Sequence, residues 1–148
     1  MLVRDVMQRE VATLDADDHL DLADDVMRLG RIRHLPIVSA GRLVGILSQR
    51  DLFRAAVSSL LQIARAARQQ WLAHIRINSV MTTEVVTIGP ERPVREAVAI
   101  MLERKIGCLP VVEGERLVGL VSETDCLRVL KHALDAAETK SQLPEMPQ

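Results

Sequence analysis

Hydrophobic and polar positions alternate in short blocks along this chain, and the same series of blocks occurs twice. Short runs rich in β-branched residues, VATL at 11–14 and VVTI at 85–88, predict strands that end in turn-forming residues. Apolar residues at helical spacing then predict helices that begin near residues 20 and 94. Two nearly continuous apolar runs follow each helix, separated by SAGR or EGER, whose length suits a tight turn. Each block therefore predicts the order strand, helix, strand, strand, helix.

The second series is a copy of the first at a constant offset of 74 residues. RIRHLPIVSAGRLVGILSQRD at 31–51 recurs as KIGCLPVVEGERLVGLVSETD at 105–125, and the offset holds without a gap from Val6 and Val80 onward. Each copy is small for burying a core of its own, so the two copies are expected to pack as a pseudo-twofold pair. We predict an α/β fold with a first repeat at 1–60, a linker at 61–76, a second repeat at 77–135 and a flexible tail at 136–148.

The segment between the repeats predicts one long helix. From Gln49 to about Ile75 there is no Gly or Pro, and apolar residues recur at a heptad-like spacing: Phe53, Val57, Leu60, Ala64, Ala67 and Trp71. No Asp or Glu occurs from Leu52 to Thr83, whereas four arginines do: Arg54, Arg65, Arg68 and Arg76. These cations fit either a solvated helix face or a docking surface for an acidic partner.

Composition excludes several classes of protein. The chain of 148 residues has a formal net charge of -1 and 48% hydrophobic residues, which is typical of a soluble globular protein. It has no apolar run long enough to span a membrane and no signal-peptide core, so we predict a cytoplasmic protein. The near-zero charge, and the presence of only two aromatic residues, Phe53 and Trp71, argue against nucleic-acid binding.

Metal and catalytic motifs are also missing from the sequence. Cys108 and Cys126 lack CxxC spacing and the four histidines are scattered, so we predict neither a disulfide framework nor a structural metal. The glycine spacing of GERLVG is that of a phosphate-binding loop, but Gly119 leads into Leu120 and Val121 instead of Lys and Ser or Thr. We predict that the protein is not an enzyme.

One short polar element is repeated where a strand gives way to a helix. Ser48 is followed three residues later by Asp51, and Ser122 by Asp125. Such a pair can form a variant of the capping box, in which the Ser accepts a first-turn N–H and the acid reaches back. Alternatively, the exposed N–H groups of a helix start attract phosphates, and an ionised carboxylate suits the paired hydroxyls of a ribose. The spacing leaves both interpretations open.

The repeated LPIV and LPVV strands, each followed by a turn and then GRLVGILSQRD or ERLVGLVSETD, resemble the cystathionine-beta-synthase (CBS) domain family. Two copies at a constant offset resemble the paired arrangement called a Bateman module, over roughly residues 1–135. This resemblance implies clefts between the copies that bind AMP, ADP or ATP, with S-adenosylmethionine or NAD as further candidates. It also implies a flat homodimer that regulates another protein.

The resemblance also implies roles for individual residues. Asp51 and Asp125 would hold ribose hydroxyls, Ser48, Ser122 and Thr124 would lie near phosphates, and Thr13 and Thr87 would lie near the adenosine. The adenine would contact the aliphatic strand residues Leu35, Pro36, Ile37, Leu109, Pro110 and Val111. Because aromatic residues are so few, base recognition is expected to use aliphatic contacts and main-chain hydrogen bonds.

The two copies differ at this predicted site. The first copy carries larger side chains where the second carries small ones: Arg33, His34 and Arg50 against Gly107, Cys108 and Thr124. Small residues leave room for a base, so we expect the cleft with Asp125 to be the better adenosine site. The cleft with Asp51 would prefer more highly phosphorylated ligands or stay empty. His34 could equally be a partly exposed surface histidine, and Cys108 a small buried hydrophobe.

The sequence therefore predicts a stand-alone regulatory module that senses adenine nucleotides and acts in trans on a partner that it does not identify. The alternative is a scaffold of the same fold that dimerises through the apolar stripe at 53–71 and binds no nucleotide. In that case the Ser and Asp pairs would serve only as helix caps.

Overall fold

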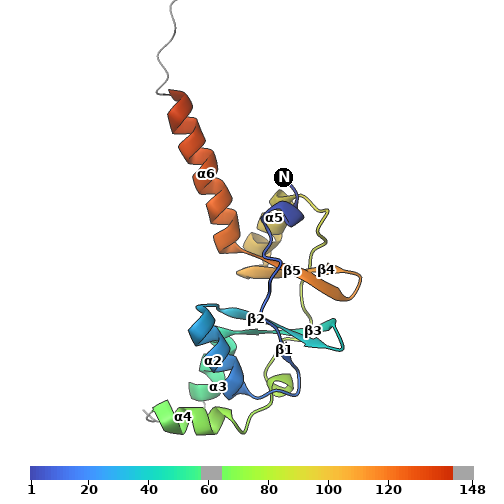
Figure 1. Cartoon of the computed structure of the whole chain (residues 1–148), viewed down its shortest axis with the longest axis vertical. Helices are drawn as coiled ribbons and strands as arrows, with labels where there is room; N and C mark the ends of the chain where they lie inside the picture. Colours follow the sequence, from blue (N-terminus) through green and yellow to red (C-terminus); the bar gives the residue numbers. More distant parts are fainter. Residues whose placement is uncertain (58–64, 142–148) are drawn as a thin grey trace, which may run out of the picture.

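The computed structural model describes residues 1–57 and 65–141, and it confirms two copies of one α/β unit (Figure 1). The first copy contains α1 (Val3–Val6), β1 (Leu14–Asp15), α2 (Leu20–Gly30), β2 (His34–Ser39), β3 (Arg42–Ser48) and α3 (Gln49–Val57). Helix α4 (Arg65–Leu72) follows. The second copy contains the 3-10 helix η1 (Ile77–Ser79), α5 (Val94–Arg104), β4 (Cys108–Glu113), β5 (Arg116–Ser122) and α6 (Glu123–Ser141).

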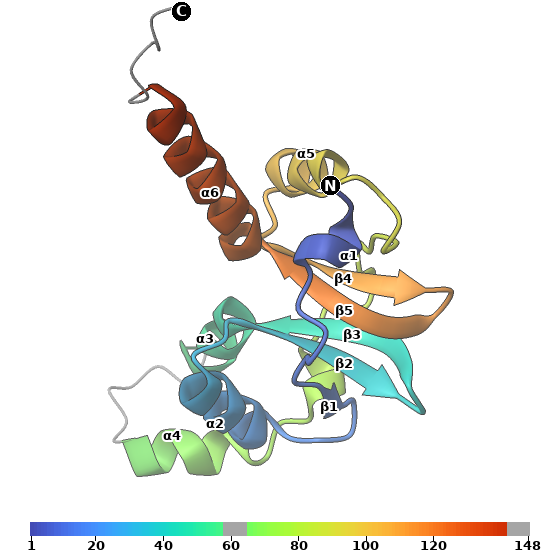
Figure 2. The same cartoon turned by 45° about the horizontal axis from the view of Figure 1, so that its top comes forward.

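The strands form one mixed sheet in the order β1-β2-β3-β5-β4. Strands β2 and β3 form one antiparallel hairpin and β4 and β5 another, with a register shift at the same place in each, after Ile37 and after Val111. The hairpins meet where Arg42 pairs with Arg116 and the Leu43 N–H donates to the Glu115 carbonyl at 3.0 Å. Figure 2 shows them one above the other with the helices on the outer sides, which is the expected pseudo-twofold pair.

The first strand of each copy is shorter than the sequence predicts. Strand β1 is two residues long, and in the second copy Ile88 forms only an isolated bridge with Val111. The physical reason is that the chain before β1 crosses from one half to the other. The main chains of Gln8 and Leu120 exchange two hydrogen bonds, at 2.8 and 2.9 Å, so the stretch after Gln8 must travel between the hairpins before it can pair with β2.

The core of each half contains a residue from the segment that leads into the other half of the chain. The first core contains Ile77 from η1, and its other members are Leu20, Ala23, Met27, Leu35, Ile37, Leu47, Leu52 and Leu72. The second core contains Val3 from α1 together with Ile88, Ala97, Met101, Leu109, Val111 and Val121. Val3 and Ile77 are both fully buried and occupy equivalent positions in the repeat. The two halves therefore complete one another.

Two glycines permit this exchange of segments. A Cβ atom at Gly119 would lie 2.7 Å from Met7 Sδ and 2.9 Å from the Gln8 carbonyl oxygen. At Gly45 it would lie 2.5 Å from Met81 Sδ and 3.0 Å from the Thr82 carbonyl oxygen. At each glycine one of these two atoms belongs to the main chain, so rotation of a neighbouring side chain could not make room for a Cβ atom.

The linker differs from the predicted single helix. Within the described residues it forms two helices, α3 and α4, which contact each other and also contact α2 (Figure 2). The stripe residues Leu60 and Ala64 lie outside the described residues. Helix α4 is held against α2 because the Arg68 guanidinium donates to both Asp24 oxygens, at 3.0 and 3.1 Å, and because Leu72 enters the first core.

This docking also changes the interpretation of the basic segment. Arg68 is paired with Asp24, and Arg76 lies 3.8 Å from Asp17, so two of the four cations have carboxylate neighbours within the chain. Phe53 and Trp71 remain 65% and 45% exposed.

Helix α6 continues to Ser141, beyond the predicted boundary at residue 135, and projects away from the sheet (Figure 1). It carries three leucines that are each more than half exposed: Leu127, Leu130 and Leu134. Among the described residues no helix is long and apolar enough to cross a membrane.

Replacing Gly119 with Ala should lower the free energy of unfolding by roughly 1 to 3 kcal/mol, because the new methyl group would overlap Met7 and the Gln8 main chain. Urea denaturation followed by circular dichroism measures the change. Gly30→Ala is the matched control, because its nearest neighbour is a flexible Ile32 side chain at 3.5 Å, and it should leave stability unchanged or raise it by up to about 1 kcal/mol. Equal stability of the Gly119→Ala variant and the unmodified protein would contradict the packing argument.

Candidate functional site

The strand β3 passes into helix α3 through a turn that Ser48 and Asp51 close together. The Ser48 N–H and the Ser48 hydroxyl both donate to Asp51 Oδ2 at 2.8 Å, and the Asp51 N–H donates to Ser48 Oγ at 3.1 Å. These are the reciprocal contacts of a capping box. In the described part of the chain nothing donates to the second carboxylate oxygen, Asp51 Oδ1.

In the equivalent turn between β5 and α6, the carboxylate accepts more hydrogen bonds. The Ser122 N–H and hydroxyl donate to Asp125 Oδ2 at 2.9 and 2.6 Å. The other oxygen, Oδ1, accepts from Gln8 Nε2 at 2.8 Å and from the Arg128 guanidinium at 2.9 Å. Asp125 is only 4% exposed. Both oxygens of this carboxylate therefore already have donors.

The repeat explains why the two turns differ. Thr82 stands where the other half has Gln8, and its shorter side chain has no amide to donate. Arg54 is the counterpart of Arg128, but no hydrogen bond links it to Asp51 in the described chain. The sequence analysis missed Gln8 because it lies 117 residues from Asp125. The difference between Gln8 and Thr82, which occupy equivalent positions in the two copies, could have indicated its role.

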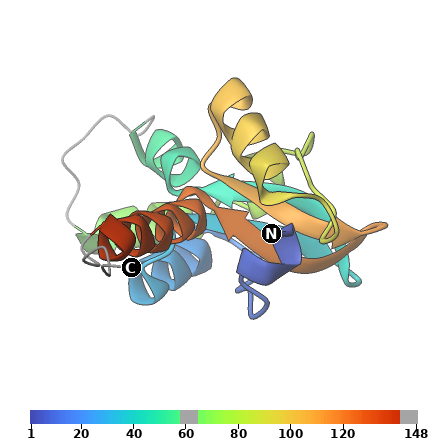
Figure 3. The same cartoon turned by 90° about the horizontal axis from the view of Figure 1, so that it is seen from above.

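Both turns lie at the same end of the molecule. Figure 3 shows the hairpin turns at one end and the starts of α3 and α6 at the other. His34 opposes Ser48 in one hairpin, and Cys108 opposes Ser122 in the other. The two halves touch here, since a Cβ atom at Gly107 would lie 3.3 Å from His34 Cε1 and 3.4 Å from Glu123 Oε2.

The surroundings of His34 keep its imidazole neutral. Burial lowers the pKa of His34 below its usual 6.5, and the positive charge of Arg33 lowers it further. Glu123 and Asp51 oppose that shift more weakly. The imidazole is therefore a neutral polar group between the two turns near pH 7, able to donate from one nitrogen and accept at the other.

The two cysteines are poor nucleophiles in this environment. Burial raises the pKa of Cys108 to about 12, and the neighbouring Glu123 carboxylate adds to the effect. The pKa of Cys126 is also raised, chiefly by burial and then by Asp125. The Cys108 side chain thus behaves as a small buried apolar group beside Gly107.

The remaining predicted site residues fall into three groups. The exposed ones are Arg33, Arg50 and Thr124, close in sequence to the turns, and Thr13 before β1, whereas Thr87 is half-buried. The aliphatic residues Leu35, Ile37, Leu109 and Val111 have their side chains in the two cores. Pro36 and Pro110, which are also buried, alternate with them along the strands and so point to the opposite face.

The two hollows found on the described surface lie elsewhere. One, of about 490 Å³, is bordered by the N-terminal segment and the start of β5, and the other, of about 360 Å³, lies between the hairpin turns. None of the predicted site residues lines either hollow. The described residues also contain no group of three or more His, Cys, Asp or Glu side chains that could hold a metal ion.

Comparison with known proteins places these two halves in a family. The CBS domain family matches the chain twice, at residues 3–58 and 77–132. The chain belongs to the CBS domain family. Both matches include the segment that crosses to the other half, the first match includes all of α3, and the second ends within α6.

Relatives of two kinds contain this CBS pair. A CBS domain-containing protein of Dictyostelium discoideum is 33% identical over 143 residues, which is 95% of this chain and 99% of that protein. An inosine-5′-monophosphate dehydrogenase of Korarchaeum cryptofilum is 32% identical over 91% of this chain, but the match spans only 25% of the dehydrogenase. The CBS pair thus occurs both as nearly a whole protein and as part of a longer one.

Solved CBS structures share the arrangement of the two halves. A Vibrio cholerae protein described as an acetoin utilization protein, AcuB, has a TM-score of 0.77 and 35% identity, covering 94% of this chain and 96% of that one. The CBS domain pair of protein MJ0100, crystallised in complex with 5′-methylthioadenosine and S-adenosyl-L-methionine, also has a TM-score of 0.77. It is 27% identical and covers 90% of this chain and 98% of that one.

His34→Gln should flatten the pH dependence of stability on the acid side of pH 6.5. The folded protein has the lower pKa, so on acidification the unfolded chain takes up the proton first, and stability falls as the pH drops below 6.5 towards the folded pKa. Above pH 6.5 both states are neutral and the histidine contributes no pH dependence. Urea midpoints between pH 5 and 8 measure this, with His132→Gln on exposed α6 as the control. Parallel curves for His34→Gln and the unmodified protein would refute the assignment.

Proposed function

We propose that this CBS pair binds an adenosine-containing ligand at the end of the molecule where the two Ser and Asp turns meet. In the cytoplasm it regulates a partner in trans and does not catalyse a reaction. The observation that carries the proposal is the half-buried Asp51 turn with an unused carboxylate oxygen, in a chain of which 90% resembles the CBS domain pair of MJ0100. That domain pair was crystallised with two adenosine derivatives.

The chemistry around Asp51 suits a nucleotide. Asp51 Oδ1 can accept a hydrogen bond from a ribose hydroxyl while Oδ2 keeps its capping contacts. Arg33 and Arg50 are exposed beside the turn and can donate to phosphates, and neutral His34 lies between the two halves. AMP, ADP and ATP fit this set of donors. S-adenosylmethionine and NAD share the adenosine part.

Hydrogen bonding favours the Asp51 turn over the Asp125 turn as the first site to fill. A ribose at Asp125 would have to displace Gln8 or Arg128 from Oδ1. The sequence differences pointed the other way, because Gly107 and Cys108 leave more room at the second turn. We therefore expect a ligand to bind at Asp51 without displacing an internal donor, whereas binding at Asp125 first requires Gln8 or Arg128 to leave Oδ1.

A ligand-independent scaffold is the second candidate function. The complete set of donors on Asp125 favours it, because this carboxylate acts as a helix cap and as a link between Gln8 and α6 without any ligand. The scaffold and the nucleotide sensor share the fold, and they differ in whether Asp51 Oδ1 accepts a hydrogen bond from a ligand.

Isothermal titration calorimetry of the full chain with AMP, ADP, ATP, S-adenosylmethionine and NAD tests the proposal. At least one ligand should bind with a micromolar Kd. Asp51→Ala should weaken that binding on the order of tenfold or more, because a hydrogen bond to a charged group contributes roughly 1.5 to 3 kcal/mol. Asp125→Ala should weaken binding less and lower the free energy of unfolding more, because it removes four internal contacts.

The matched control is Asp135→Ala, which removes an exposed carboxylate on α6 that pairs only with Lys131. It should leave the affinity unchanged. Because Asp51→Ala also removes a cap worth about 1 kcal/mol, the titrations are run well below its unfolding temperature. Absence of heat with all five ligands, from folded protein freed of bound nucleotide, would favour the scaffold.

The proposed assembly is a homodimer, with α6 supplying part of its surface. Leu127, Leu130 and Leu134 follow one another at intervals of three and four residues, so they form one exposed apolar stripe. An aqueous surface seldom keeps three neighbouring leucines on one helix face without a partner.

Leu130→Asp should shift the protein towards monomer, because it places a charge in the middle of this stripe. Light scattering coupled to size-exclusion chromatography measures the molar mass, and at micromolar concentration we expect the dimer mass to fall by about half. His132→Asp introduces the same charge on the opposite face of α6 and is the control. A Leu130→Asp variant that keeps the dimer mass would exclude the stripe from the interface.

A further inference from the structure

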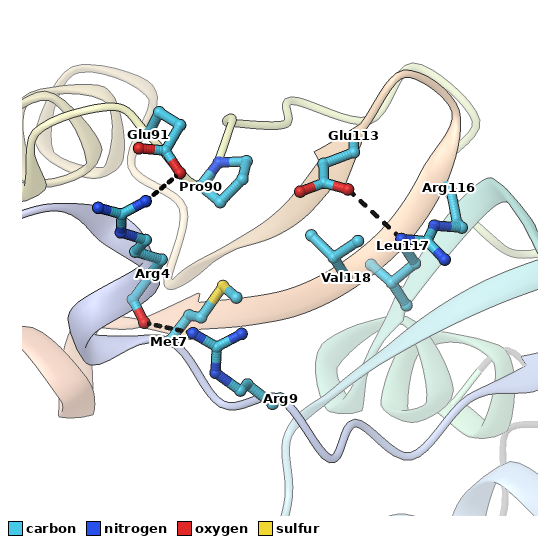
Figure 4. A pocket seen from close by; sticks show the side chains of 9 residues that line it. All are labelled: Arg4, Met7, Arg9, Pro90, Glu91, Glu113, Arg116, Leu117 and Val118. Atoms are coloured by element: carbon cyan, nitrogen blue, oxygen red, sulfur yellow. Dashed lines mark hydrogen bonds and ion pairs between the residues drawn. The ribbon is translucent and has the colours of Figure 1, made fainter.

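The hollow beside the N-terminal segment has a rim of charged side chains and an apolar floor. Figure 4 shows Arg4 and Glu91 on one side and Glu113 and Arg116 on the other, with Met7 and Arg9 between them. Its volume of about 490 Å³ lies within the range of small-molecule sites. We call it the N-terminal hollow.

The charges on this rim do not cancel. Arg4 forms an ion pair with Glu91, and Arg116 lies 3.4 Å from Glu113. Arg9 has no carboxylate partner among the described residues, and donates only to the Arg4 carbonyl oxygen at 3.2 Å. The hollow therefore contains one cation whose charge is not balanced. Its guanidinium keeps several N–H donors for another acceptor.

The floor beneath Arg9 is aliphatic. Met7, Leu117 and Val118 are each partly buried, and Pro90 adds a fourth apolar side chain. An anion that carries an apolar group could place its charged end on the guanidinium and its apolar end on this floor. A guanidinium above such a surface binds carboxylates and phosphates through two parallel hydrogen bonds.

The other half of the molecule lacks these cations. At an offset of 74 residues Met81, Leu43 and Val44 repeat the floor, which packing requires in both halves. Arg4 and Arg9, however, correspond to Asn78 and Thr83. The two extra arginines are thus not a requirement of the repeated fold, and both line the N-terminal hollow.

We propose that the N-terminal hollow binds a small organic anion. Its carboxylate or phosphate lies on Arg9, with Arg4 as a second donor, and its apolar part lies on Met7, Leu117 and Val118. The site is separate from the turn at Asp125. The hollow is lined by the first three residues of β5, whereas the turn follows the end of this strand.

Methionine methyl groups report on this site directly. In the full chain labelled with ¹³C-methyl methionine, titration with phenyl phosphate or benzoate should shift the Met7 methyl signal to saturation. The Met81 signal, from the equivalent floor without the arginines, should stay in place. Inorganic phosphate at the same ionic strength should bind at least tenfold more weakly than phenyl phosphate, because it cannot use the apolar floor.

Arg9→Gln should weaken phenyl phosphate binding at least tenfold, whereas Arg42→Gln, at the equivalent of Arg116 in the other half, should not. Unchanged methionine signals of the free variants show that both remain folded. Equal shifts of Met7 and Met81, or full binding to Arg9→Gln, would overturn the proposal. Equal affinity for inorganic and phenyl phosphate would overturn the organic class of ligand. Asp51→Ala should bind phenyl phosphate normally, so this test is independent of the nucleotide site.

Discussion

The exchange of leading segments between the two halves is the constraint on which the rest of the structure depends. Val3 enters the second core and Ile77 enters the first, so neither core is complete without chain from the other half. Met7 and Met81 lie against glycines at equivalent positions, which fixes how closely each segment approaches the opposite hairpin. The geometry that brings the two Ser and Asp turns to one end follows from this crossed arrangement.

On this symmetric frame the polar residues are distributed unequally. The two capping turns have the same internal hydrogen bonds, yet only Asp125 also receives Gln8 and Arg128. The N-terminal hollow is lined by Arg4 and Arg9, whose counterparts in the other half are Asn78 and Thr83. The repeat thus gives both halves the same arrangement of strands and helices, and differences at single side chains make the two halves chemically distinct.

Much of this fold could be predicted from the sequence because its signals are local or periodic. The repeated apolar runs predicted both hairpins, and the spacing of Ser48 and Asp51 gave the capping contacts as one of two interpretations. The crossing of α1 into the second core could not be predicted in this way, since a contact between distant segments leaves no periodic trace. The docking of α4 on α2 likewise involves Arg68 and Asp24, which lie 44 residues apart in the sequence. The ligand roles of the site residues remain predictions, and the role of Gln8 became visible only in three dimensions.

The crossed segments also determine how the molecule comes apart. If the halves were joined only by a linker, each could unfold while the other stayed intact. Here, if the first core unfolds, Ile77 is released from it. The residues directly after Ile77, including Met81 and Thr82, then lose their contacts with β3. Disruption of the second core releases Val3 and the main-chain bridge at Gln8 in the same way. The two repeats therefore form a single cooperative unit, and free energy gained at one turn stabilises the whole chain.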